Sequence, residues 1–176
     1  MFKKIIIILT VAIAIFAVVA YLQPNEFKVT RSITINSNAG DIFKLVNNQP
    51  QWEKWSPWPA LDPNAKFSFE GPEAGVGSVS KWSGNSKLGE GSSTIIESTP
   101  NKDIKFKLDF VRPFKHNADA EFSFVENKDG TLVSWSISGN KNFVQKAMGL
   151  VLNCDKMIGE QFDAGLNKLK TVAEKK

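Results

Sequence analysis

Residues 117–139 read NADAEFSFVENKDGTLVSWSISG, in which apolar and polar side chains alternate on both sides of a short polar turn. Alternation with a period of two is typical of strands that bury one face. Asn127 to Gly130 has the composition of a hairpin turn. The stretch therefore predicts an antiparallel hairpin with one apolar face. The side chains of that face are Ala118, Ala120, Phe122, Phe124, Val133, Trp135 and Ile137.

The same pattern continues towards the N-terminus, where turn residues separate further alternating segments. Between the first two of these segments, Ser37-Asn38 caps a short helix over 41–46, and 51–54 forms one more helical turn. Seven strands are expected in all, at about 26–35, 65–70, 77–84, 88–99, 103–112, 117–127 and 131–139.

The last segment, 142–174, changes to a period of three to four, which predicts one long amphipathic helix. Its apolar stripe includes Cys154, and we expect Cys154 and Met157 to be buried. Gly165 costs about 1 kcal/mol relative to alanine in a helix, which indicates close packing against the sheet. An antiparallel sheet needs a cover on one face, and this helix is the only element long enough. The predicted fold is α+β, a seven-stranded sheet curled around the C-terminal helix.

The N-terminus carries an uncharged apolar run from Ile5 to Leu22. As a helix it is about 27 Å long, close to the thickness of a bilayer core. Two readings remain: an uncleaved membrane anchor, favoured by length, or a signal peptide cleaved after Ala20. In both, Lys3 and Lys4 hold the N-terminus in the cytoplasm. We expect a single-pass protein of a bacterial cytoplasmic membrane whose domain lies on the exported side.

Composition favours one globular domain after this segment, since 42% of the chain is hydrophobic and 23% charged. We divide the chain into an anchor and linker, 1–25, and a domain, 26–176. The net charge of +4 is scattered, and no basic cluster accompanies the aromatic residues, so nucleic acid is not an expected partner. The single cysteine excludes an internal disulfide. His116 has no zinc-type spacing with other ligands, and neither metal nor cofactor is expected.

Residues 50–63, PQWEKWSPWPALDP, concentrate tryptophan and proline. Pro50 begins a helical turn that places Trp52 and Trp55 on one side, and Pro57 and Pro59 then leave Trp58 on an extended arm. The arm is either a lid that closes the core or a set of ligand contacts. The two roles are compatible.

Several segments together resemble the SRPBCC or START-like superfamily, specifically its polyketide cyclase/dehydrase-type proteins. The resemblance covers about 26–174 and implies the helix-grip fold, with an apolar cavity between sheet and helix. It does not imply a reaction. The segments are ITIN (33–36), W-x-x-WSPW (52–58) with Asp62-Pro63, GVGSVSKWSGN (75–85), LGEGSSTIIESTP (88–100), DGTLVSWSISG (129–139) and MIGEQFDAGLNKLK (157–170).

An apolar, aromatic cavity is typical of a ligand pocket, and the inner faces of 103–110, 118–124 and 131–137 carry no ionisable group. No catalytic residue is expected, although a bulge could turn Arg31, Lys81, Glu90 or Glu97 inward. The leading interpretation is membrane-tethered binding of a hydrophobic small molecule or lipid. A cyclase or dehydratase and a stress-related interaction module with a filled core are the alternatives. The expected ligand-binding residues are Trp55, Trp58, Phe67, Phe69, Trp82, Phe106, Leu108, Phe110, Phe122, Phe124 and Trp135.

Overall fold

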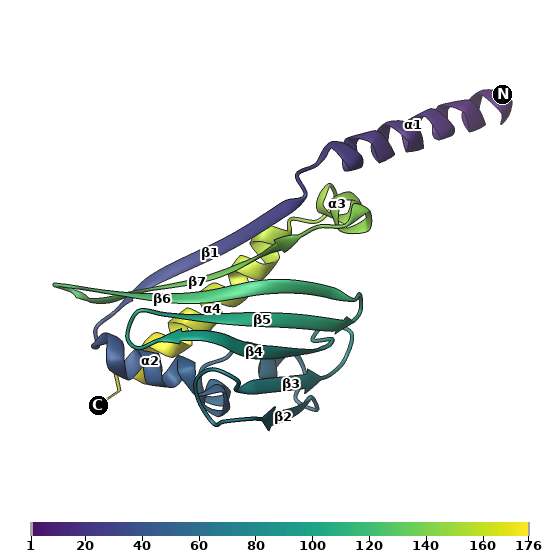
Figure 1. Cartoon of the computed structure of the whole chain (residues 1–176). Coiled ribbons are helices and arrows are strands. Elements are labelled where there is room, and N and C mark those ends of the chain that lie inside the picture. Colours follow the sequence, from purple (N-terminus) through teal and green to yellow (C-terminus); the bar gives the residue numbers. More distant parts are fainter. Residues whose placement is uncertain (1, 176) are drawn as a thin grey trace.

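The computed structural model describes residues 2–175 and contains a curved antiparallel sheet with a long helix behind it (Figure 1). The elements are α1 Phe2–Leu22, β1 Glu26–Ile35, α2 Ala39–Asn47, η1 Gln49–Lys54, η2 Trp58–Leu61, β2 Lys66–Glu70, β3 Val79–Ser83, β4 Glu90–Thr99, β5 Asp103–Arg112, β6 His116–Asn127, β7 Gly130–Asn140, α3 Phe143–Gly149 and α4 Cys154–Ala173; η1 and η2 are 3₁₀ turns. The α+β helix-grip architecture is confirmed.

The sheet has seven strands in the order β1-β7-β6-β5-β4-β3-β2. The β6–β7 hairpin pairs Phe122 with Trp135, and Gly130 in its turn has a φ of 122°, where a side chain would be strained. The first strand, β1, pairs with β7 and forms one edge of the sheet, next to the hairpin of the last two strands. The predicted strands and their inward faces are confirmed.

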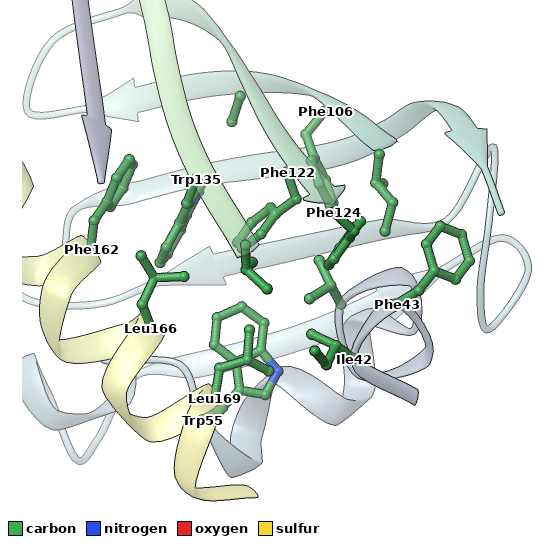
Figure 2. Close-up of a cluster of buried hydrophobic side chains, with 14 of the residues drawn as sticks. Ile42, Phe43, Trp55, Phe106, Phe122, Phe124, Trp135, Phe162, Leu166 and Leu169 are labelled. Atoms are coloured by element: carbon green, nitrogen blue, oxygen red, sulfur yellow. The ribbon is translucent and has the colours of Figure 1, made fainter. Parts of the chain in front are cut away.

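The core lies between the sheet and one face of α4. Figure 2 shows Phe162, Leu166 and Leu169 on the side of α4 that faces the sheet, and all three are buried. The ring of Phe162 stacks on Trp135 with centroids 4.0 Å apart. A Cβ on Gly165 would lie 2.9 Å from the Trp135 ring, so the close packing predicted for this glycine is confirmed.

The C-terminal segment forms two helices, where the sequence predicts one. Asn142 caps α3 through a capping box with Gln145, and the Asn153 side chain accepts the backbone N–H of Lys156. In a continuous helix that N–H would donate to residue 152, so the cap ends the continuity. At the start of α4, Cys154 and Met157 are exposed, and the expectation that both are buried is wrong.

Arg31 lies on the inner face of β1 and reaches across α4. Its guanidinium pairs with Asp155 at 2.9 Å and with Asp163 at 3.4 Å. Gly159 lies between these two carboxylates along the helix, and a Cβ at that position would overlap the guanidinium. The bond to Asp155 is the main cause that raises the pKa of Arg31. The arginine therefore joins strand to helix at the surface and does not enter the cavity.

α1 extends away from the sheet at the end where α3 lies (Figure 1). Its 21 residues are long and apolar enough to cross a membrane, a property that signal sequences share. The two helices are in contact, and Lys146 of α3 donates to the backbone carbonyl of Tyr21 at 3.2 Å.

Candidate ligand-binding site

A cavity of about 390 Å³ lies between the inner face of the sheet, the turns η1 and η2, and α4. This volume falls in the range of about 300–1,000 Å³ that is common for small-molecule sites. α4 supplies Ile158 and Phe162, and the strands supply most of the remaining wall. α4 packs on β1 and β7 at one side of the curled sheet, and η1 packs on β3 at the other. The curl leaves the cavity between these two contacts.

Tryptophans of the proline-rich segment form one side of the cavity. The indole N–H of Trp52 donates to the Val46 carbonyl at 2.8 Å, and that of Trp55 donates to the Leu45 carbonyl at 3.1 Å. Both rings are thereby held against the end of α2, with centroids 4.6 Å apart. Trp58 begins a second 3₁₀ turn and does not lie on the predicted extended arm, because Pro57 adopts a helical conformation.

The structure brings most of the predicted ligand-binding residues together in the cavity wall, and their binding role stays a prediction. They are Trp58, Phe67, Phe69, Trp82, Phe106, Leu108, Phe110 and Trp135. Trp55, Phe122 and Phe124 lie elsewhere, in the packed core, where Trp55 and Phe122 are fully buried. These three point to the inner side as predicted, but neighbouring side chains fill the space in front of them.

Other residues of the cavity wall are not among the ligand-binding residues predicted from the sequence. Trp52 belongs to the same aromatic, proline-rich segment as Trp58, and this composition is the signal that could have identified it. Gln49 and Ser93 give no comparable signal, since a polar residue in a turn or on a strand usually faces water. Gln49 is 2% exposed and Ser93 is 7% exposed.

The charged side chains of the wall, Glu53, Lys87 and Arg112, are exposed and lie at its rim. Arg112 pairs with Glu90 at 2.8 Å, with the two side chains 56% and 38% exposed. Glu97 pairs with Lys105, and Lys81 with Glu70, also in exposed positions. None of these ion pairs is a buried pair of the kind that general acid–base catalysis requires.

Asp62 fastens the rim. Its carboxylate accepts the backbone N–H of Asn85 at 2.7 Å and that of Asn64 at 3.0 Å. Asn85 belongs to the β3–β4 connection, so one buried carboxylate joins this connection to the end of η2. Both segments contribute to the cavity wall through Leu61 and Leu88.

His116 lies outside the cavity wall, at the start of β6. Its ring lies between Phe27 and Phe110, with centroids 6.0 Å and 6.1 Å away, and burial lowers the pKa of His116. Within residues 2–175, no cluster of three or more His, Cys, Asp or Glu side chains could hold a metal ion.

Comparison with solved structures places this fold among known ones. A protein of Chromobacterium violaceum is 11% identical, with a TM-score of 0.61 over 88% of this chain and 100% of its own. The di-domain ARO/CYC protein BexL is 17% identical, with a TM-score of 0.63 over 90% of this chain and 53% of its own. Ginseng major latex-like protein 151 from Panax ginseng is 16% identical, with a TM-score of 0.57 over 85% of this chain and 99% of its own. At these identities the likeness shows the fold alone.

Among curated proteins, the comparison gives no match. The sequence itself matches one family, described as polyketide cyclase / dehydrase and lipid transport, over residues 26–174. That match spans the sheet, the cavity and α4. The chain therefore belongs to the polyketide cyclase/dehydrase and lipid transport family of SRPBCC-type proteins.

Proposed function

We propose that this protein binds a hydrophobic small molecule or lipid in its cavity while α1 tethers it to a membrane. The observation that carries the proposal is the cavity itself, about 390 Å³ and lined mainly by aromatic and aliphatic side chains. Removal of apolar ligand surface from water supplies the binding free energy, at about 25 cal/mol per Å². The proposed domain, 26–176, then works next to the bilayer that α1 enters.

The cavity supports a binding protein over the two alternatives. A module with a filled core would leave no room for a ligand. A cyclase or dehydratase needs a positioned acid or base near the reacting atom, and the charged side chains of this wall stand exposed at the rim.

The surface beside α1 supports the tether. Phe143, Val144, Val151 and Leu152 are each 42–75% exposed. The first two belong to α3, which contacts α1, and the other two follow α3 in the chain. Apolar side chains in such a position fit the boundary of a bilayer.

Titration with a fluorescent apolar probe tests the binding proposal. Trp58 lines the cavity without full burial, so Trp58→Ala should weaken binding several-fold and keep the fold intact by circular dichroism. Glu97→Gln, on an exposed ion pair away from the wall, is the matched control and should leave the affinity unchanged. Native mass spectrometry of gently purified protein should also show a copurified apolar molecule. If the protein turned over a substrate and Glu90→Gln abolished that turnover, the proposed function would be catalysis and not binding.

A further inference from the structure

One region of the cavity wall is polar. Ser93 faces inward from β4, between Gly91 and Ile95, and lines the cavity. Its hydroxyl oxygen is buried and has no hydrogen-bond partner within residues 2–175. A buried hydroxyl left unpaired costs about 1–3 kcal/mol, and buried polar groups are therefore nearly always paired. The Ser93 hydroxyl is available to a bound molecule.

Gln49 contacts the backbone carbonyl of Ser93 and is fixed in one orientation. Its Nε2 donates to the backbone carbonyls of Ser78 at 2.9 Å and Ser93 at 3.2 Å. The reversed amide would place an oxygen against two carbonyl oxygens, so the assignment is chemically determined. Its Oε1 accepts from no group of the described chain, and the residue lines the cavity.

Ser80 completes this region, because it lies directly opposite Ser93 in the β3–β4 pair and also lines the cavity. We call Gln49, Ser80 and Ser93 the polar end. It offers hydroxyl donors and an amide acceptor, and it contains no charge. The cationic groups of the wall, Lys87 and Arg112, are exposed at the rim.

We propose that the polar end binds an uncharged oxygen function, a hydroxyl or carbonyl, on a ligand that is otherwise apolar. This inference rests on the proposed binding function and narrows its ligand class. A hydroxyl can donate to Gln49 Oε1 and accept from Ser93, and a carbonyl can accept from Ser93. A carboxylate or phosphate would lose its hydration here without gaining a cation, which is strongly unfavourable.

Two probes of similar shape test this proposal on the full-length protein: 2-naphthol carries the hydroxyl, and 2-methylnaphthalene replaces it by a methyl group. Wild-type protein should bind 2-naphthol more tightly. Ser93→Ala should weaken 2-naphthol about five- to tenfold, the size of one hydrogen bond, and change the affinity for 2-methylnaphthalene less than about twofold. Ser92→Ala, on the neighbouring outward position of β4, should change neither.

The unliganded variant supplies a second readout. Since Ser93→Ala removes an unpaired hydroxyl, its melting temperature should equal or exceed that of wild type. A clear drop in melting temperature would mean that the hydroxyl already has a partner, and would overturn the proposal that the polar end binds an oxygen function. Equal effects of Ser93→Ala on both probes, or no effect on either, would overturn it as well. Binding of neither probe by wild type would overturn the proposed function itself.

Discussion

At the scale of single residues, Trp135 connects the packed core to the cavity. Its ring stacks on Phe162, lies 4.8 Å from Phe122 between centroids, and forms part of the cavity wall. Trp135→Ala should lower the free energy of unfolding by about 3–5 kcal/mol, measured by urea denaturation. Leu132→Ala, on the outer face of the same strand, is the control and should cost much less. A loss below about 0.5 kcal/mol for Trp135→Ala would place the ring at the surface, against the structure.

His116 makes stability depend on pH at the same scale. Its pKa is lowered in the folded protein by burial between Phe27 and Phe110, while the unfolded chain titrates near 6.5. The unfolded state therefore binds more protons as pH falls. The stability contribution is complete above about pH 6.5 and is lost as pH falls through that value towards the folded pKa.

Urea denaturation between pH 7.5 and 5 should show this loss for wild type and a flatter profile for His116→Phe, which keeps an aromatic ring at the position. Carboxylates contribute equally to both proteins, so the difference between the two profiles isolates the histidine. Identical profiles would show that the ring is solvated.

At the scale of elements, Gly159 lets the Arg31 guanidinium pass between Asp155 and Asp163 on α4. Alanine normally stabilises a helix by about 1 kcal/mol relative to glycine. In an Arg31→Ala background, Gly159→Ala should therefore stabilise the protein. With Arg31 present, the new methyl group displaces the guanidinium, so the gain should be cancelled or reversed. A double-mutant cycle should give a coupling of at least about 0.5 kcal/mol.

Gly165 on the same helix is the control for this cycle. A methyl group there meets the rings of Trp135 and Pro57, which cannot move aside as a flexible side chain can. Gly165→Ala should cost about 1–3 kcal/mol whether or not Arg31 is present. If Gly159→Ala changed stability by the same amount with and without Arg31, as Gly165→Ala should, Arg31 would not join β1 to α4.

At the scale of the whole molecule, the tether that we propose predicts that the end of the domain next to α1 and α3 lies at a bilayer. Cys154 is the only cysteine of the chain and is exposed close to the apolar segment after α3. A polarity-sensitive dye on Cys154 of full-length protein in vesicles should be quenched by lipids that carry a quencher. Cys154→Ser combined with Lys128→Cys moves the dye to the β6–β7 turn. The register of β1 on β7 puts that turn about 30 Å along the strands from the start of β1, where α1 ends.

The second site should be protected from the quencher. Equal quenching at both sites, or none at Cys154, would contradict the arrangement. Protein that is recovered without the vesicles and begins at Tyr21 would show a cleaved signal peptide. The division at residue 25 and the exported location of the domain stay predictions until such measurements are made.

The sequence by itself determined the strands, their inward faces and the helix that covers them. Alternation at Phe122, Phe124, Val133 and Trp135 is a local property, because successive side chains of a strand point to opposite faces whatever lies beyond. The helix-grip arrangement follows, since a sheet with one apolar face and one amphipathic C-terminal segment have few ways to bury both. The apolar length of α1 is likewise local.

Only the tertiary structure decided which inward side chains meet empty space and which meet each other. Trp55 lies in the same proline-rich segment as Trp58, and Phe122 faces inward on its strand as Phe106 does. Trp58 and Phe106 line the cavity, whereas Trp55 and Phe122 pack against other side chains. The break before Asn153 was hidden because apolar spacing continues across it. Gln49 lies in the cavity wall because its amide donates to the carbonyls of Ser78, just before β3, and of Ser93 on β4. Each outcome depends on the curvature of the sheet and on segments distant in the chain, and local spacing carries no information on either.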